Sequence, residues 1–266
     1  MSFLSTLNAR WAATGSLLCV GLDPDPDKFP SALRNDVGSI ARFCIDIVDA
    51  TAEFVCAFKP QIAYFAAVGA EKQLEELCQH IRANHPTIPL ILDAKRGDIG
   101  DTAALYAREA FDRYGAHAVT VSPYLGTDSI EPFLAHAGKG VFVLCRTSNV
   151  GSGEFQSQVS NGMPLYQHVA TRAATDWATK GEVGLVVGAT YPEELKIVRE
   201  IVGDMTLLVP GVGAQGGDPH AVVTHGSNSV GRGLIVNSSR AILYASDTDY
   251  ASGAHDAARA TAASLV

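Results

Sequence analysis

Long apolar runs are absent from this sequence. No stretch approaches the roughly 18 consecutive apolar residues that a membrane-spanning helix needs. The first residues, Met1 to Trp11, also lack the basic and then apolar layout of a secretory signal peptide. We therefore expect a protein that does not associate with membranes and that resides in the cytoplasm.

An excess of positive charge is absent as well. The 266 residues include 20 Lys and Arg against 28 Asp and Glu, which gives a formal net charge of −8 at pH 7. A chain with this balance is not expected to bind nucleic acid or an acidic membrane surface. If its ligand is an anion, positive groups near the binding site must overcome the overall negative field.

Paired cysteines and the common motifs of metal and nucleophile sites are also missing. The five cysteines are isolated on apolar stretches, with no CxxC pair and no nearby histidine at a metal-ligand spacing. Neither an HExxH motif nor a Ser/His/Asp arrangement is present. We expect ordinary buried thiols and no metal in the functional site. The cysteines are Cys19, Cys44, Cys56, Cys78 and Cys145.

A repeating pattern of strands and helices is present. A short run rich in Val, Ile and Leu is followed by polar, Gly or Pro residues and then by an amphipathic stretch, and this unit recurs eight times. Nearly continuous apolar runs are typical of parallel strands buried on both faces. We predict an α/β fold, a (β/α)8 TIM barrel in which residues 1–266 form a single domain. The expected strands are 16–22, 54–58, 89–92, 118–121, 140–145, 183–187, 205–209 and 233–236.

Two segments between these strands are informative. Residues 149–163 are rich in Gly, Ser, Asn and Gln and predict a surface loop after the fifth strand. Residues 36–54 show the spacing of a helix with one core-facing stripe. The apolar residues of that stripe are Ile40, Phe43, Cys44, Ile47 and Val48.

Polar residues gather directly after the expected strands. In α/β barrels the active site lies at the C-terminal ends of the strands, on the loops that follow them. These side chains would therefore meet at one barrel mouth and form a concave, charged site. They are Asp23, Lys59, Asp93, Lys95, Ser122, Ser148, Gln215 and Arg240.

Asp93 and Lys95 are the most informative of these residues. On an extended backbone, residues two apart point to the same side, so their charges can make contact. An isolated Asp-x-Lys is often only a solvated ion pair, and Lys59 could equally be a surface lysine. All three follow apolar strands, which favours a site where carboxylates and amines perform the chemistry.

The glycine-rich segment 210–219 and Arg240 indicate a phosphate site. The loops after strands seven and eight of such barrels commonly bind phosphate through backbone N–H groups. Arg240 can add a charge-assisted hydrogen bond. A glycine-rich loop alone is often a plain turn, but its pairing with an arginine at the next strand end favours a phosphorylated substrate.

These motifs resemble the orotidine 5′-monophosphate decarboxylase family. The family's D-x-K-x-x-D signature appears as Asp93-Ala94-Lys95-Arg96-Gly97-Asp98, accompanied by Ile99 and Thr102. The chain is similar to the longer-chain bacterial branch of the family in the sequences of residues 58–60 and 95–98 and in the insertion 149–163. One departure is Asn237-Ser238-Ser239-Arg240, where compact members have a shorter Gly-Arg ending. Further matching pieces are residues 21–24, 57–61, 147–149, 210–217 and 239–240.

The resemblance implies a role for each site residue. Lys59, Asp93, Lys95 and Asp98 would be catalytic, with Lys95 as the proton donor. Asp23 and Lys59 would bind ribose hydroxyls, and Ser148 would contact the pyrimidine. Asp98, Ile99 and Thr102 would enter the site of a neighbouring subunit, which implies a homodimer with shared active sites. Gln215 and Arg240 would hold the phosphate, and Pro210 and Ser239 would also belong to the substrate-binding set.

The resemblance also implies the reaction, in which orotidine 5′-monophosphate (OMP) yields uridine 5′-monophosphate (UMP) and carbon dioxide in pyrimidine biosynthesis. No cofactor motif is present, so fixed charges must stabilise the carbanion that the loss of carbon dioxide leaves. Lys59, Asp93, Lys95 and the neighbour's Asp98 alternate in sign and suit that purpose. Two carboxylates beside Lys95 favour its charged form, which argues against a Schiff-base aldolase.

Two other functions are compatible with parts of the pattern. A sugar-phosphate decarboxylase of the same barrel type, such as the 3-keto-gulonate 6-phosphate enzyme, carries D-x-K-x-x-D in a magnesium site, but Ile99 and Thr102 favour the nucleotide enzyme. A non-catalytic sensor of a phosphorylated ligand is the second alternative, because a fold does not fix a function. The presence of Lys59, Asp93 and Lys95 argues against a sensor.

Overall fold

Eight short apolar strands form one parallel sheet whose two edges meet. A computed structural model describes residues 1–34, 36, 38–212 and 216–265. The order of the strands in the sheet follows their order in the chain. The two edge strands, β2 and β3, are joined by parallel bridges between Phe58 and Leu90 and between Gln61 and Asp93, so the sheet closes into a barrel. The strands are β1 (Leu18–Leu22), β2 (Ala57–Pro60), β3 (Ile91–Arg96), β4 (Ala118–Val121), β5 (Gly140–Arg146), β8 (Glu182–Val187), β9 (Thr206–Pro210) and β10 (Leu234–Ser238).

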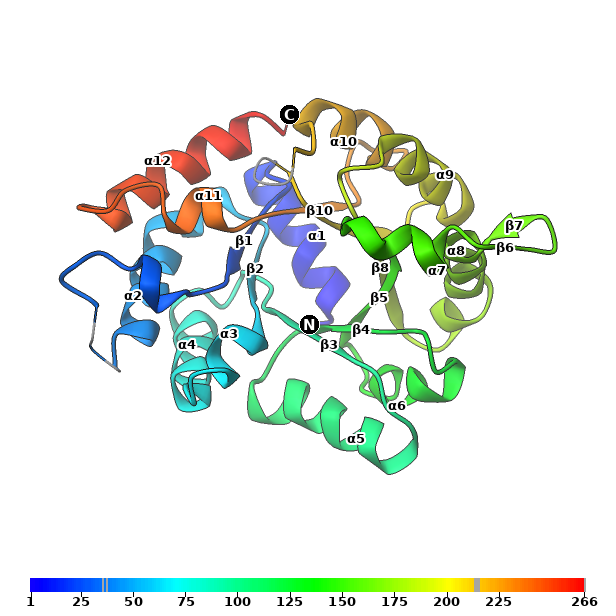
Figure 1. Ribbon diagram of the computed structural model, residues 1–266, viewed down its shortest axis with the longest axis horizontal. Helices are drawn as coiled ribbons and strands as arrows, with labels where there is room; N and C mark the ends of the chain where they lie inside the picture. Colours follow the sequence, from blue (N-terminus) through cyan, green and yellow to red (C-terminus); the bar gives the residue numbers. More distant parts are fainter. Residues whose placement is uncertain (35, 37, 213–215, 266) are drawn as a thin grey trace.

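Helices surround this barrel, as Figure 1 shows. The predicted TIM-barrel fold is therefore confirmed, and each predicted strand coincides with an observed one to within a few residues. The α-helices are α1 (Phe3–Thr14), α2 (Ser39–Thr51), α3 (Ile62–Ala66), α4 (Glu71–Asn84), α5 (Gly100–Arg108), α6 (Glu131–Leu134), α7 (Gly153–Gln156), α8 (Leu165–Thr175), α9 (Pro192–Val202), α10 (Pro219–Gly226), α11 (Arg240–Leu243) and α12 (Tyr250–Ala263). The shorter helical turns are η1 (Pro26–Lys28), η2 (Ala52–Phe54), η3 (Glu109–Arg113), η4 (Thr127–Ser129), η5 (Val150–Ser152) and η6 (Trp177–Thr179).

Helix α2 illustrates why the outer helices pack as they do. The five residues of its predicted stripe are all buried, so the expected core-facing helix is confirmed, although it ends at Thr51 and continues as the turn η2. Removing such a stripe from water contributes about 1.5–3 kcal/mol for each large apolar side chain. The five cysteines are buried and unpaired, as predicted.

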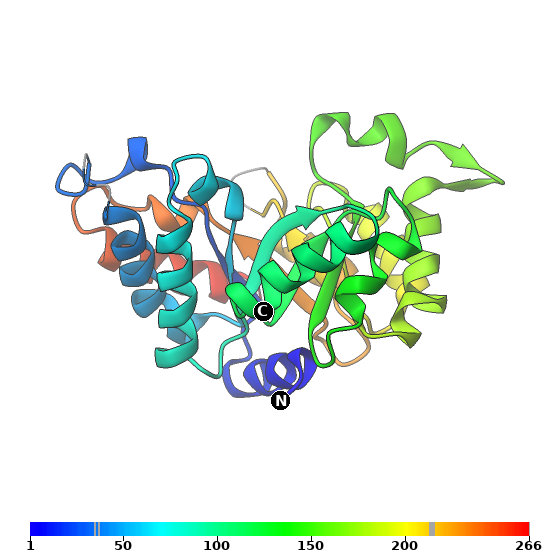
Figure 2. The ribbon, with the colours of Figure 1, turned by 90° about the horizontal axis from the view of Figure 1, so that it is seen from below.

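Helix α1 covers one end of the barrel, opposite the loops that follow the strands (Figure 2). Phe3 packs edge to face on Phe142 of β5, with ring centroids 5.6 Å apart. Gly140 allows this approach, because a Cβ atom there would lie 2.5 Å from the Phe3 ring. Since α1 covers the N-terminal ends of the strands, the opposite end is left for a site.

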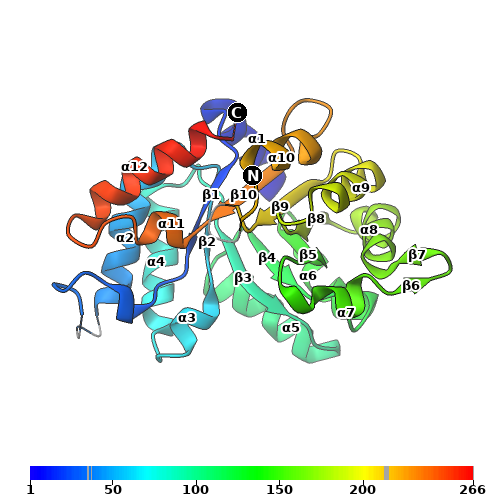
Figure 3. The same cartoon turned by 45° about the horizontal axis from the view of Figure 1, so that its top comes forward.

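The segment 149–163 is more ordered than the surface loop that its composition predicts. It contains the turn η5, the helix α7 and a two-stranded hairpin of β6 (Val159–Ser160) and β7 (Met163–Pro164). The hairpin projects away from the barrel (Figure 3). Buried Arg146 organises the start of the segment, since its guanidinium binds Ser152 and Glu194. A side-chain anchor of this kind is not visible in composition.

In the described part of the chain, no helix is both long enough and apolar enough to cross a membrane.

Candidate active site

A cavity of about 510 Å³ lies at the C-terminal ends of the barrel strands. It brings together most of the site residues predicted from the sequence, although they come from six different strand ends. The predicted residues that line it are Asp23, Lys59, Asp93, Lys95, Ser148, Pro210, Ser239 and Arg240. The lining residues that sequence reasoning did not assign to the site include Gln61, Tyr64, Thr147, Gln156 and Asn237.

The carboxylate of Asp93 is held by two lysines. Lys59 Nζ, on β2, lies 2.9 Å from Asp93 Oδ2, and Lys95 Nζ lies 2.7 Å from Asp93 Oδ1. The side chains of Lys59 and Asp93 are almost completely buried, whereas that of Lys95 is 45% exposed toward the cavity mouth. The predicted contact between Asp93 and Lys95 is confirmed, and Lys59 binds the other oxygen of the same carboxylate.

These contacts fix the charges of the buried pair. Burial by itself would raise the pKa of Asp93, but Lys59 and Lys95 outweigh burial and hold that pKa well below its usual range. Burial would likewise lower the pKa of Lys59, but Asp93 and Asp23 outweigh it and raise that pKa above its ordinary value. Asp93 is therefore an anion and Lys59 a cation across the neutral pH range.

The end of β3 departs from the extended backbone that the sequence analysis assumed. The register between β3 and β4 shifts between Leu92 and Arg96, and Lys95 has a positive φ of 46°. A non-glycine residue in this left-handed region is strained by about 1–3 kcal/mol and persists only where its surroundings enforce it. Lys95 therefore meets Asp93 through a bulge in the strand rather than through two-residue alternation.

Thr120, on β4, stabilises this bulge. Its hydroxyl oxygen accepts hydrogen bonds from the backbone N–H groups of Ala94 and Lys95, at 3.0 and 2.9 Å. The same hydroxyl donates to Asp93 Oδ1 at 2.8 Å. Thr120 is 1% exposed. Sequence reasoning missed it because a threonine inside a buried strand gives no signal of its own.

One wall of the cavity carries polar atoms that have no protein partner. Asp23 Oδ1, Asn237 Oδ1 and Ser239 Oγ are buried and, within the described residues, without hydrogen bonds. They meet where β1 and β10 run side by side, and Gly21 makes room for them, since a Cβ there would lie 2.9 Å from Asn237 Oδ1. Buried polar atoms are normally paired, so this wall is suited to hydrogen bonding a polar ligand.

The loops after β9 and β10 form another side of the cavity. The loop after β9 is closed at its base, where Gly217 N–H donates to the Gly211 carbonyl at 3.1 Å. Gly211 has a φ of 101°, which favours glycine. Arg240 lines the same cavity as Gly211, and among the residues that the structure describes its guanidinium pairs with no carboxylate. Gln215 lies outside the described residues.

The segment after β5 contributes to the mouth of the cavity. Ser148 lines it together with Gln156, which belongs to α7. Gln156 is fixed by Thr147, whose backbone N–H donates to Gln156 Oε1 at 2.8 Å, while Gln156 Nε2 donates to Thr147 Oγ1 at 2.9 Å. The insertion thereby brings an amide to the same opening as Lys95.

Four of the described residues predicted for the site do not line the cavity. One of them, Ser122, lines a different pocket together with Tyr124 and Tyr166. Asp98, Ile99 and Thr102 lie where β3 leads into α5, and Ile99 and Thr102 are exposed. Asp98 Oδ1 accepts a hydrogen bond from the backbone N–H of Ile99 at 2.8 Å. Their predicted action in a neighbouring subunit involves a second chain, so it stays a prediction.

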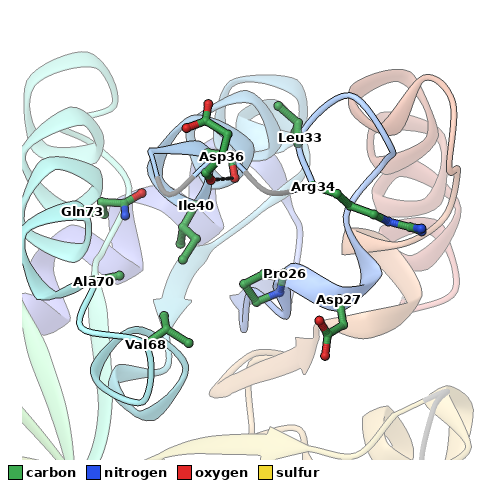
Figure 4. Close-up of a pocket in the computed structure, with 10 residues that line it drawn as sticks. Pro26, Asp27, Leu33, Arg34, Asp36, Ile40, Val68, Ala70 and Gln73 are labelled. Carbon is green, nitrogen blue, oxygen red and sulfur yellow. Dashed lines mark hydrogen bonds between the residues drawn. The ribbon is translucent and has the colours of Figure 1, made fainter.

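A second hollow of similar size, about 530 Å³, lies between the β1 loop and the α3–α4 region (Figure 4). Its interior is faced by Pro26, Ile40 and Val68, and the guanidinium of Arg34 points away from it. Arg34 Nε instead donates to the Phe29 carbonyl at 2.7 Å. Because its charged groups do not converge, the hollow lacks the constellation that the first cavity has.

Comparison with known proteins gives one consistent result. Residues 16–254 match the model of the orotidine 5′-phosphate decarboxylase / HUMPS family. A protein of Ralstonia pickettii named orotidine 5′-phosphate decarboxylase is 60% identical over 98% of this chain and 97% of its own. One of the same name from Bordetella pertussis is 60% identical over 97% and 96%. The solved structure of Leishmania donovani OMP decarboxylase is 40% identical, with a TM-score of 0.88 over 100% of this chain and 98% of its own.

Proposed function

The chain belongs to the orotidine 5′-phosphate decarboxylase family, and from this we propose how it carries out that family's reaction. It converts OMP to UMP and carbon dioxide, a carboxy-lyase step of pyrimidine biosynthesis. The observation that carries the proposed mechanism is the Asp93 carboxylate fixed between Lys59 and Lys95 at the cavity floor. Charges held in this way need no rearrangement when the reaction occurs.

Lys95 is the proton donor in this mechanism. When the bond between the pyrimidine ring and its carboxylate breaks, the electron pair stays on the ring carbon and carbon dioxide leaves. The Lys95 ammonium stabilises that charge and then gives its proton to the carbon, so that a C–H bond forms and a neutral amine remains. The amine takes a proton from water before the next turnover. Of the two lysines on Asp93, Lys95 is the one exposed to the cavity mouth.

Remote contacts hold the substrate. Asp23 and Lys59 bind the ribose hydroxyls, which fits the unpartnered Asp23 Oδ1 in the cavity wall. Ser148 contacts the pyrimidine. Phosphate lies between the loops after β9 and β10, beside the cation of Arg240, which pairs with no carboxylate within the described residues. The remaining residues of this set are Pro210, Gln215 and Ser239.

The working unit is a homodimer with shared active sites. Asp98, Ile99 and Thr102 of each subunit complete the site of its partner. Support comes from apolar side chains exposed around α5 and the loop after β4, since such groups mark protein interfaces. The exposed fractions are 59% for Ile99, 59% for Leu105, 81% for Tyr124 and 46% for Leu125.

We also propose that residues 1–266 form one domain and that the enzyme acts in the cytoplasm. The strands of the closed barrel extend from Leu18 to Ser238, which supports a single domain. The five cysteines are free and buried, which suits a reducing compartment.

The magnesium-dependent sugar-phosphate reaction is disfavoured by the contacts of Asp93. Both of its carboxylate oxygens already bind ammonium groups, and two cations beside them would repel a divalent ion. We expect no cofactor.

The test follows the loss of OMP absorbance after exhaustive chelation of the protein and the buffer. Undiminished turnover is expected. Activity that returns only with added magnesium would support the sugar-phosphate reaction. No turnover of OMP or of the sugar phosphate would support a sensor.

The position of the phosphate has its own test. Arg240→Ala should raise KM for OMP by about 10- to 100-fold, the loss expected for one charge-assisted hydrogen bond. Arg232→Ala is the matched control, because Arg232 is exposed just before the other end of β10 and does not line the cavity. If both variants keep the wild-type KM, the phosphate binds elsewhere.

A further inference from the structure

Two histidines and an aspartate converge on the outside of the barrel, away from the active site. Asp49 lies near the C-terminal end of α2, His80 in the last turns of α4, and His85 directly after α4. Helices α2 and α4 pack side by side (Figure 3). Their C-terminal ends lead toward the starts of β2 and β3, so the cluster lies at the barrel end opposite Lys95.

The geometry of the cluster is that of a chelating set. His80 Nε2 and His85 Nε2 each lie 2.7 Å from the same atom, Asp49 Oδ1. The three atoms all lie within 4.8 Å of one another. Around a tetrahedral ion with bonds of about 2.0–2.2 Å, ligand atoms are roughly 3.3 Å apart, so small side-chain rotations would accommodate one.

From this convergence we propose that Asp49, His80 and His85 bind a divalent transition metal of the zinc class, with water completing its coordination. Two imidazole nitrogens and one carboxylate oxygen are ligand types that Zn²⁺ prefers. The histidine side chains are 21% and 19% exposed and that of Asp49 is 51% exposed, so the open coordination positions face solvent.

The surroundings of the cluster favour a cation. Both helices end beside it, and the carbonyl groups at a helix C-terminus carry partial negative charge. The second ring nitrogen of His80 also has a neighbour, because Asn84 Nδ2 lies 3.1 Å from His80 Nδ1. When the metal binds His80 Nε2, the proton of the ring lies on Nδ1. The side-chain amide of Asn84, with its oxygen and nitrogen exchanged, then accepts a hydrogen bond from His80 Nδ1–H. Ligating histidines usually have a hydrogen-bond partner of this kind.

The site would be structural. It joins α2 to α4, and the segments after these helices lead to β2 and β3, the strands between which the barrel closes. An ion that binds only the folded chain stabilises it. The spacing along the sequence did not predict the site, because Asp49 comes from another helix than the histidines.

The test uses calorimetric titration of the metal-free, full-length protein with Zn²⁺. Saturable binding of one ion per chain is expected. His80→Gln and His85→Gln should each weaken it by about tenfold or more, and His220→Gln, which changes an exposed histidine outside the cluster, should leave it unchanged. Zn²⁺ should also raise the melting temperature of the wild type but not of Asp49→Asn.

Two results would overturn the proposal, and neither requires an active enzyme. The first is the absence of saturable Zn²⁺ binding to the wild type, which would mean that the cluster is only a hydrogen-bonded tie between two helices. The second is an equal titration in the His80→Gln/His85→Gln double variant, which would place the ion elsewhere. Because Lys95 and Arg240 are not involved, the decarboxylation assay can fail or succeed independently.

Discussion

The two lysines that bind Asp93 differ in what their removal would do. Lys59 and Asp93 are a buried pair, and taking away one partner of such a pair costs about 3–5 kcal/mol because the other charge stays buried without compensation. A Lys59 variant would therefore lose folding stability as well as catalysis, so its activity would not isolate the catalytic role of Lys59. Lys95 is 45% exposed, so its replacement affects the free energy of unfolding much less.

Lys95→Ala therefore tests the proton donor with little effect on folding. Turnover of OMP should fall by about 10⁴-fold or more, the upper range for a positioned proton donor. Binding of a 6-substituted UMP analogue, measured by calorimetry, should persist because the phosphate contacts are elsewhere. Lys180→Ala is the control, since Lys180 forms an exposed ion pair with Glu131 outside the cavity. Wild-type turnover in Lys95→Ala would end the assignment.

Thr120 acts through its neighbours rather than on the substrate. Thr120→Val keeps the shape of the side chain but removes the hydroxyl that joins Asp93 Oδ1 to the N–H groups of Ala94 and Lys95. Each donor left unsatisfied costs about 1–3 kcal/mol, so the strained bulge should relax and displace Lys95. We expect kcat to fall by about 10- to 100-fold with a smaller change in KM.

Thr120→Ser separates this positioning role from simple packing. Serine retains the hydroxyl and loses only a methyl group, so steady-state assays should show kcat close to wild type. If the valine variant keeps full kcat, or if the serine variant loses as much as the valine variant, the hydroxyl does not position Lys95.

The loop after β9 depends on a close approach between backbone atoms at its base. A Cβ on Gly217 would lie 2.5 Å from Ala189 Cβ and 2.8 Å from the Gly211 carbonyl oxygen. Neither atom is the end of a flexible side chain. Gly217→Ala should therefore open the base, and we expect kcat/KM for OMP to fall by about 10- to 100-fold, in line with an overpacking cost of about 1–3 kcal/mol.

A second glycine offers a matched control for that loop. Gly153 begins α7 with helical dihedrals, and a Cβ there would lie 3.7 Å from Ser157 Oγ, an ordinary contact. Gly153→Ala should keep wild-type kinetics. The circular dichroism spectra of the two alanine variants should match, which shows that both are folded. Equal kcat/KM in these two variants would then show that the base of the loop after β9 does not govern substrate binding.

The elements also show how far the sequence could predict the site. Continuous apolar runs located the strands, and strand ends located Lys59, Asp93, Lys95 and Arg240 at one cavity, because parallel strands direct their C-terminal ends to one barrel mouth. The bulge at Lys95 was not predictable, since alternation assumes an unbroken ladder. Asn237 and Gln156 were missed because their place in the cavity depends on packing between distant segments.

A single chain leaves the array of charges in the active site incomplete. Lys59, Asp93 and Lys95 lie in the cavity, but Asp98 does not line it. The proposed homodimer resolves this, because a two-fold axis can bring Asp98 of one subunit to the cavity of the other. The apolar groups exposed beside α5, such as Ile99 and Leu105, would be covered in the same interface.

The shared site predicts that two inactive variants restore each other's activity. In a hybrid of a Lys95→Ala subunit with an Asp98→Ala subunit, one site carries both defects and the other has Lys95 and Asp98 intact. Random reassortment of equal amounts makes about half the dimers hybrid, so about one quarter of all sites should be wild type. The two proteins are mixed, allowed to exchange, and assayed with OMP against wild type treated identically. Mass-tagged subunits confirm the exchange. If exchange occurs and activity does not rise, Asp98 acts within its own chain.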